Sequence, residues 1–119
     1  MQPNIIILVP DDVGREQFRE LGYDSGNTYP TMPFFSRLVQ QGVLFRRAYA
    51  SPWCSPTRVK MHTGYMAYQS GVAQLADRQQ PLLEEWTSLP AAVKMASDDL
   101  YATACVGKWH MANYANTGD

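Results

Sequence analysis

The chain has 119 residues, enough for one ordinary domain and too few for two. Apolar residues make up 45% and aromatic residues 12%, so the composition excludes a largely disordered protein. Ten basic residues against eleven acidic ones give a net charge of -1, and no basic run offers a footprint for nucleic acid. Charged residues make up only 18%, below the roughly 25% of average composition, which hints at a surface that a partner covers.

Neither a membrane span nor a leader is expected in this chain. The longest aliphatic run, Ile5 to Val9, is far shorter than the roughly 18 apolar residues that a spanning helix needs. The first residues lack the basic start and the cleavage site of a signal peptide. We therefore expect a cytoplasmic protein, or a periplasmic or secreted one whose leader has been removed. Two cysteines make no disulfide framework and leave the redox compartment open.

The hydrophobic pattern predicts strands and helices in alternation. Ile5 to Val9 is a continuous, mostly branched aliphatic run, typical of a strand buried on both faces of a parallel sheet. Apolar residues at helical spacing predict a helix that begins at Pro33 and is capped by Gly42. Further along, the pattern predicts a strand at 43–49, a short helix from Cys54 to about Thr63, a long surface excursion at 65–88, a helix capped near Ser88, a strand at 101–106 and no core pattern at 113–119. This order favours an α/β fold, a mostly parallel sheet flanked by helices, in a single domain over residues 1–119.

Polar side chains follow the predicted strands, and ligands of open α/β sheets bind beyond the carboxyl ends of the strands. We therefore expect these side chains to converge. Asp11 and Asp12 follow the first strand as adjacent carboxylates, which a hard divalent cation such as Ca²⁺ or Mg²⁺ would hold together. Alternatively, the pair lies in a turn and caps a helix.

A second and a third polar cluster follow the other two strands. The run Cys54-Ser55-Pro56-Thr57-Arg58 puts a thiol and a guanidinium at a helix start, where free amides favour anions and an activated nucleophile. Lys108 and His110 would join Arg58 to grip a tetrahedral oxyanion. The alternatives are a buried cysteine, a surface ion pair for Arg58, and solvated or structural side chains for the others, including His62. Cys105 fits a small buried side chain inside a strand.

The motif Cys54-x-Pro56-x-Arg58, followed by Thr63-Gly64, resembles the signature of the type I, formylglycine-dependent sulfatases, which belong to the alkaline phosphatase superfamily. The resemblance continues in three other blocks in the same order, at Pro3 to Gly14, Gly42 to Ala50 and Tyr101 to His110. It covers the N-terminal part of the catalytic fold, and family chains are considerably longer.

The resemblance implies a role for each polar cluster. A separate maturation enzyme would convert Cys54 into formylglycine, whose hydrated aldehyde attacks sulfur with one hydroxyl and expels sulfate with the other. Asp11, Asp12 and the modified Cys54 would bind a divalent cation, usually Ca²⁺, with Mg²⁺ as the alternative. Arg58 would hold the modified residue, Lys108 would neutralise sulfate, and His110 would hydrogen-bond the second hydroxyl.

The implied function is hydrolysis of sulfuric esters, with a small sulfate ester or a sulfated sugar as substrate. Two alternatives stay open. The chain could be an inactive or partner-dependent sulfatase-like fragment, completed by a second copy or by a missing C-terminal portion. It could also hydrolyse phosphate or phosphonate esters, because that chemistry uses the same metal and oxyanion contacts.

Overall fold

The computed structural model describes residues 3–22, 26, 28–75 and 86–111. This part of the chain consists of helices and irregular or extended segments, and it contains no strand. Two compact units follow one another in sequence, Met1–Tyr49 and Ala50–Asp119. No helix in the described ranges is long and apolar enough to cross a membrane.

The predicted parallel sheet is therefore wrong for the described residues. A run of branched aliphatic residues favours an extended backbone, but a strand exists only when a neighbouring strand takes its hydrogen bonds. Ile5 to Val9 is free of helix and turn, yet its side chains are 43–79% exposed rather than buried on both faces. The segments 43–49 and 101–106 also form no strand, and Cys105 is exposed rather than buried.

The predicted helices are confirmed. Helix α1 spans Pro33–Gln41 and ends where the Gly42 N–H donates to the Leu38 carbonyl at 2.8 Å. Helix α2 spans Cys54–Thr63, and α4 spans Leu89–Ala96 after the Ser88 hydroxyl accepts the Ala91 N–H at 3.3 Å. The short helix α3, Ala67–Ser70, lies in the segment predicted to be irregular. Residues 76–85 of that excursion and the 113–119 tail fall outside the described residues.

The first unit packs two short 3₁₀ helices, η1 (Arg15–Gln17) and η2 (Arg19–Leu21), against α1. The Phe18 and Phe35 rings lie 4.5 Å apart between centroids, within the range for a favourable aromatic pair. The Ser36 hydroxyl donates to the Glu20 carboxylate. No residue in the described part of this unit is fully buried, so these few side-chain contacts hold it together.

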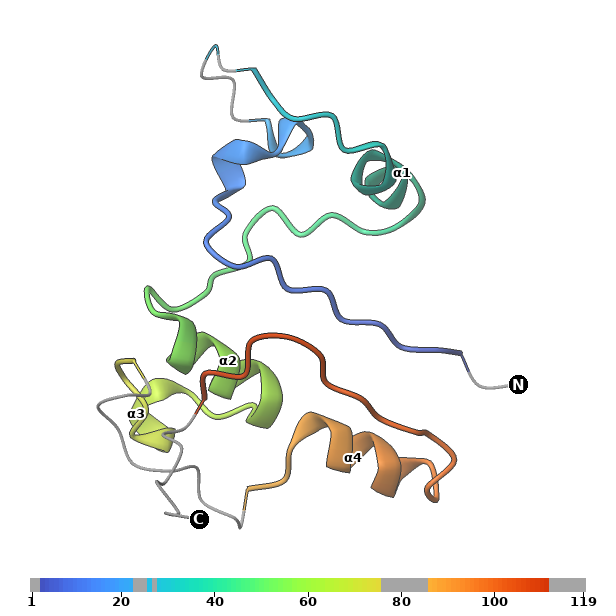
Figure 1. Ribbon diagram of the computed structural model, residues 1–119, viewed down its shortest axis with the longest axis vertical. Helices are drawn as coiled ribbons and strands as arrows, with labels where there is room; N and C mark the ends of the chain where they lie inside the picture. The colour runs from blue at the N-terminus through green and yellow to red at the C-terminus, as the bar shows by residue number, and fades with distance from the viewer. Residues whose placement is uncertain (1–2, 23–25, 27, 76–85, 112–119) are drawn as a thin grey trace. The chain divides into compact units, whose positions relative to one another are not determined.

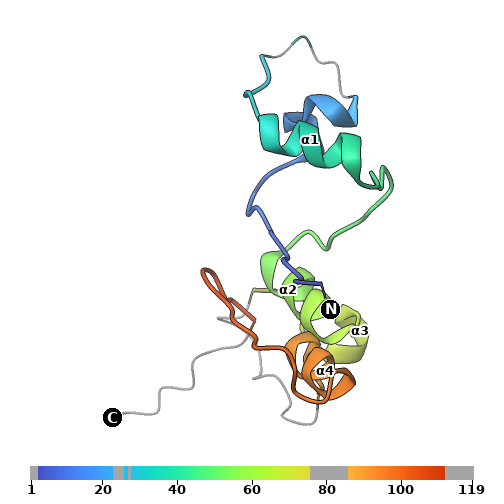
Figure 2. The same ribbon diagram turned by 90° about the vertical axis from the view of Figure 1, so that its right-hand side faces the viewer.

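The second unit has a small buried core beneath α2. Val59 is fully buried and packs with Val72 and Met111, and Trp86 covers this cluster from the side. Helices α3 and α4 both contact α2, and they lie beside it in both ribbon views (Figures 1 and 2). The core thus sits directly under the helix that begins at Cys54.

Candidate functional site

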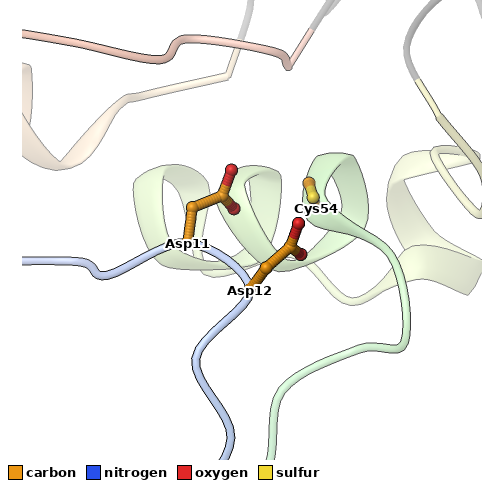
Figure 3. Close-up of side chains that lie close together, drawn as sticks. All are labelled: Asp11, Asp12 and Cys54. Carbon is orange, nitrogen blue, oxygen red and sulfur yellow. The ribbon is translucent and has the colours of Figure 1, made fainter. Parts of the chain in front are cut away.

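The two adjacent carboxylates lie in the first unit, where the extended segment ends. Figure 3 shows the Asp11 and Asp12 side chains on consecutive residues, and both are exposed. Asp12 has a φ of 52°, in the left-handed region that costs an ordinary side chain roughly 1–2 kcal/mol and that Asp tolerates better than most. Exposed carboxylate oxygens are ligands that Ca²⁺ and Mg²⁺ prefer, so this pair fits a hard divalent cation.

In the second unit, Cys54 is the first residue of α2, and its half-buried thiol is in no disulfide (Figure 3). Thr57 fixes the chain just before this helix: its hydroxyl accepts the Ser51 N–H at 2.9 Å and donates to the Ser51 carbonyl at 3.1 Å. Pro56 costs no hydrogen bond, because the first turn of a helix has no acceptors for its N–H groups. These features set the direction in which the helix leaves Cys54.

Helix α2 presents two stripes of side chains with different environments. Residues four apart lie on the same face of a helix. Ser55 and Val59 are both fully buried and form the stripe that faces the core. Cys54, Arg58 and His62 form a second stripe, here called the cysteine stripe, and all three side chains are half-buried. Burial of the first stripe therefore holds the second in a fixed orientation.

The cysteine stripe contacts a segment some fifty residues further along the chain. The Lys108 ammonium donates to the Cys54 sulfur at 3.5 Å. The Arg58 Nη1 donates to the Lys108 carbonyl oxygen at 2.5 Å. The Lys108 ammonium therefore lies against the thiol while Arg58 holds the backbone of the same lysine, an arrangement that suits a nucleophile acting on an anion.

His110 lies two residues beyond Lys108 in a constrained position. Its φ of 48° is left-handed, and its Nδ1 is buried without a hydrogen-bond partner in the structure described. The next residue, Met111, is only 1% exposed and belongs to the core. Strained backbone and unsatisfied buried nitrogen atoms are uncommon, and they concentrate at functional sites.

His62, the third member of the cysteine stripe, packs on Trp109, the residue between Lys108 and His110. The His62 and Trp109 rings lie 5.6 Å apart between centroids and are tilted by 58°. Burial lowers the pKa of His62 below its usual 6.5, and the nearby charge of Arg58 lowers it further. His62 is therefore a neutral aromatic ring at neutral pH.

Three side chains near the site receive no functional role from the sequence. His62 is interpreted there only as structural or exposed, although its position one turn after Arg58 is a usable signal. The burial of Met111 and the double hydrogen bond between Thr57 and Ser51 depend on the path of the chain in space, and no local pattern signals them. Of the four predicted catalytic residues, Cys54, Arg58 and Lys108 meet directly, and His110 lies on the segment that carries Lys108.

An ammonium lies against the half-buried thiol of Cys54, and Arg58 binds the backbone of the same lysine, an arrangement that suits an anionic substrate. Comparison with known proteins identifies the family. The sulfatase family model matches residues 3–119, and the chain belongs to the sulfatase family. It is 31% identical to human arylsulfatase D over 99% of this chain and 34% identical to human steryl-sulfatase over 92%. It is 32% identical to an N-acetylgalactosamine-6-O-sulfatase of Bacteroides thetaiotaomicron, again over 92%.

These alignments cover 20%, 19% and 21% of the three relatives, so the chain spans about a fifth of their length. No solved structure gives a significant match. The comparisons thus establish the family for this chain, and the matched part of each relative is a minority of that protein.

Proposed function

We propose that this chain carries the nucleophile-bearing part of a sulfuric ester hydrolase. The observation that supports this best is the meeting of Cys54, Arg58 and Lys108 in a member of the sulfatase family. A sulfate ester is a tetrahedral anion whose non-bridging oxygens share a negative charge throughout the reaction. Fixed cations beside the nucleophile stabilise that charge without reorganising during the reaction.

Each of these side chains has a proposed role. Cys54, after conversion to formylglycine by a separate maturation enzyme, supplies the nucleophile. Lys108 neutralises the sulfate oxygens, because its ammonium already lies against the Cys54 side chain. Arg58 fixes the backbone at Lys108 and holds the modified residue. His110 offers its unpaired Nδ1 to a hydroxyl proton of the modified residue, which would satisfy that buried nitrogen.

A divalent cation, Ca²⁺ or Mg²⁺, is proposed to bind Asp11, Asp12 and the modified Cys54. The two exposed carboxylates have the donor chemistry that such a cation requires. When bound, the cation would polarise a sulfate oxygen and favour the ionised nucleophile. Asn at either aspartate would keep an oxygen donor but lose the charge, so the carboxylates can be tested separately from the backbone.

The substrate class is a small sulfate ester or a sulfated sugar. Two of the relatives are named for a steryl sulfate and for an N-acetylgalactosamine sulfate, and neither substrate is assigned to this chain. We further propose that residues 1–119 are part of a single sulfatase domain, completed by further polypeptide or by a second copy of the chain.

The test begins with co-expression of the 119-residue chain and a formylglycine-generating enzyme. Peptide mapping is expected to find the formylglycine mass at position 54, and the matured protein is expected to release sulfate from an aryl sulfate when Ca²⁺ is present. Side-by-side rates on the matching aryl phosphate check the reaction class. A mature protein that hydrolyses the phosphate and leaves the sulfate intact would overturn the proposal.

A further inference from the structure

The cysteine stripe contains one residue to which the proposed reaction gives no role. All three of its members touch residues 108 and 109: Cys54 and Arg58 contact Lys108, and His62 packs on Trp109. The contacts of Cys54 and Arg58 are polar and go to Lys108, the residue that would bind sulfate. The contact of His62 goes to the neighbouring Trp109 and joins two rings.

The segment that receives these contacts depends on outside support for its shape. Gly107 turns the chain at one end with a φ of 98°, which glycine adopts without strain. His110 at the other end has a φ of 48°, in the left-handed region that strains a residue with a side chain. Such conformations persist only where the surroundings over-determine them. Met111 anchors one end in the core, and the Trp109 indole is the large side chain in the middle. Ring pairs with centroids 4.5–7 Å apart contribute packing beyond simple burial, and the His62–Trp109 pair lies in that range.

We propose that His62 is a positioning residue, whose ring holds Trp109 against α2 and thereby keeps the Lys108 ammonium beside Cys54 and His110 in its strained conformation. Its catalytic relevance rests on the proposed function. The placement of Lys108 can be measured whether or not the chain hydrolyses sulfate.

The placement can be read from the charge that the Cys54 thiol senses. The chain is produced without the maturation enzyme, and Cys54 is alkylated with iodoacetate, an anion, or with iodoacetamide, its neutral counterpart. Peptide mapping separates the products at Cys54 from those at the exposed Cys105. Both reagents react with the same thiolate, so the ratio of the two rates reports the nearby positive charge. One cation beside the sulfur is expected to change this ratio by about two- to fivefold, which Lys108→Gln calibrates.

The expected result is that His62→Ala lowers the iodoacetate preference by roughly twofold or more, in the same direction as Lys108→Gln. His62→Phe keeps a ring on α2 and is expected to retain the wild-type ratio. Met61→Ala, at the neighbouring exposed position, is the matched control and is expected to leave the ratio unchanged. Trp109→Ala is expected to reproduce His62→Ala, and the double variant is expected to go no further than either single variant.

A ratio in His62→Ala equal to that in Met61→Ala would overturn the inference, as would a His62→Phe variant that loses the preference. If His62→Ala fails to fold, the His62→Phe and Trp109→Ala chains still decide between these outcomes. The two proposals also fail separately. A chain that never hydrolyses sulfate but shows the expected ratios refutes the proposed function alone, whereas an active chain with unchanged ratios refutes only the role of His62.

Discussion

The two units of the chain use different means to place their polar side chains. In Ala50–Asp119, buried Val59 and Met111 fix the orientation of α2 and of the segment that carries Lys108, so the Lys108 ammonium stands at a defined distance from Cys54. In Met1–Tyr49 the described residues include none that is fully buried, and Asp11 and Asp12 follow an exposed aliphatic segment. One small core therefore organises the nucleophile site, whereas the described part of the first unit has no fully buried residue to anchor the acidic pair.

The largest expected effect is the loss of turnover when Cys54 of the second unit is replaced. In Cys54→Ser, one hydroxyl replaces the two of a hydrated aldehyde, so sulfate could be transferred to the side chain but not released. We expect at most one phenol per chain from an aryl sulfate and no steady turnover, with intact mass showing the retained sulfate. Cys105→Ser, which changes an exposed thiol, is the control and is expected to keep its turnover. Sustained multiple turnovers by Cys54→Ser would contradict the mechanism.

The next effect tests whether the acidic pair of the first unit binds Ca²⁺. Asp12→Asn keeps a side chain that tolerates the left-handed φ of 52° but removes the charge. We expect calorimetric Ca²⁺ affinity to fall by at least about tenfold, the lower limit for losing even a supporting group at a metal site. Glu16→Gln removes an exposed charge from the same unit and should leave the affinity unchanged. Equal affinities in all three proteins would show that the acidic pair binds no metal.

The same contrast explains how far the sequence could predict the molecule. Helices α1 and α4 were predictable because their signals are local: Pro33 and Gly42 bracket one, and Ser88 caps the other. The sheet was predicted wrongly, because a strand needs a hydrogen-bonding partner distant in sequence, and no pattern within Ile5–Val9 shows whether that partner exists.

The candidate site shows the same division between local and distant information. Cys54 and Arg58 could be placed on one helix face from their spacing. The expectation that Lys108 would join them rested on strand ends that the described residues lack. Lys108 reaches Cys54 because Met111 is buried beside Val59 and α2 accepts the segment on its cysteine stripe. That route depends on packing between residues fifty positions apart, which the sequence alone does not specify.

Two truncations, one of a buried and one of an exposed side chain, compare how much burial stabilises each unit. Val59→Ala removes buried methyl groups from the second unit and is expected to lower the free energy of unfolding by about 1–3 kcal/mol. Ile6→Ala, at a side chain that is 79% exposed in the first unit, is expected to change it by less than about 0.5 kcal/mol. Urea unfolding of the full chain, followed by tryptophan fluorescence and circular dichroism, gives both values. Similar losses would mean that the first unit buries Ile6 in solution.

A smaller effect concerns the second unit, where His62 is expected to make the free energy of unfolding depend on pH. The pKa of folded His62 lies below its usual 6.5, mainly through burial and then through the charge of Arg58, so the unfolded chain binds more protons as pH falls below about 6.5. Stability is fully present above that pH and declines as pH falls toward the folded pKa. His62→Phe is expected to flatten this decline between about pH 7 and 5, as measured by urea unfolding. An unchanged slope would contradict the lowered pKa of His62.

The smallest effect belongs to the first unit and appears at lower pH. The hydrogen bond from Ser36 is the main cause that lowers the pKa of Glu20 below 4.5, with its backbone and Arg19 adding to it. Its contribution is therefore present above about pH 4.5 and is lost as pH falls through the folded pKa. Ser36→Ala is expected to raise the pKa of Glu20, followed by the NMR shift of its carboxyl carbon. The half-buried carboxylate still contacts water, which screens its charge, so little change in stability is expected to accompany the shift. A large stability loss would instead implicate the second bond of Ser36, to the Met32 carbonyl at 3.1 Å, because that bond ties the hydroxyl to the start of α1.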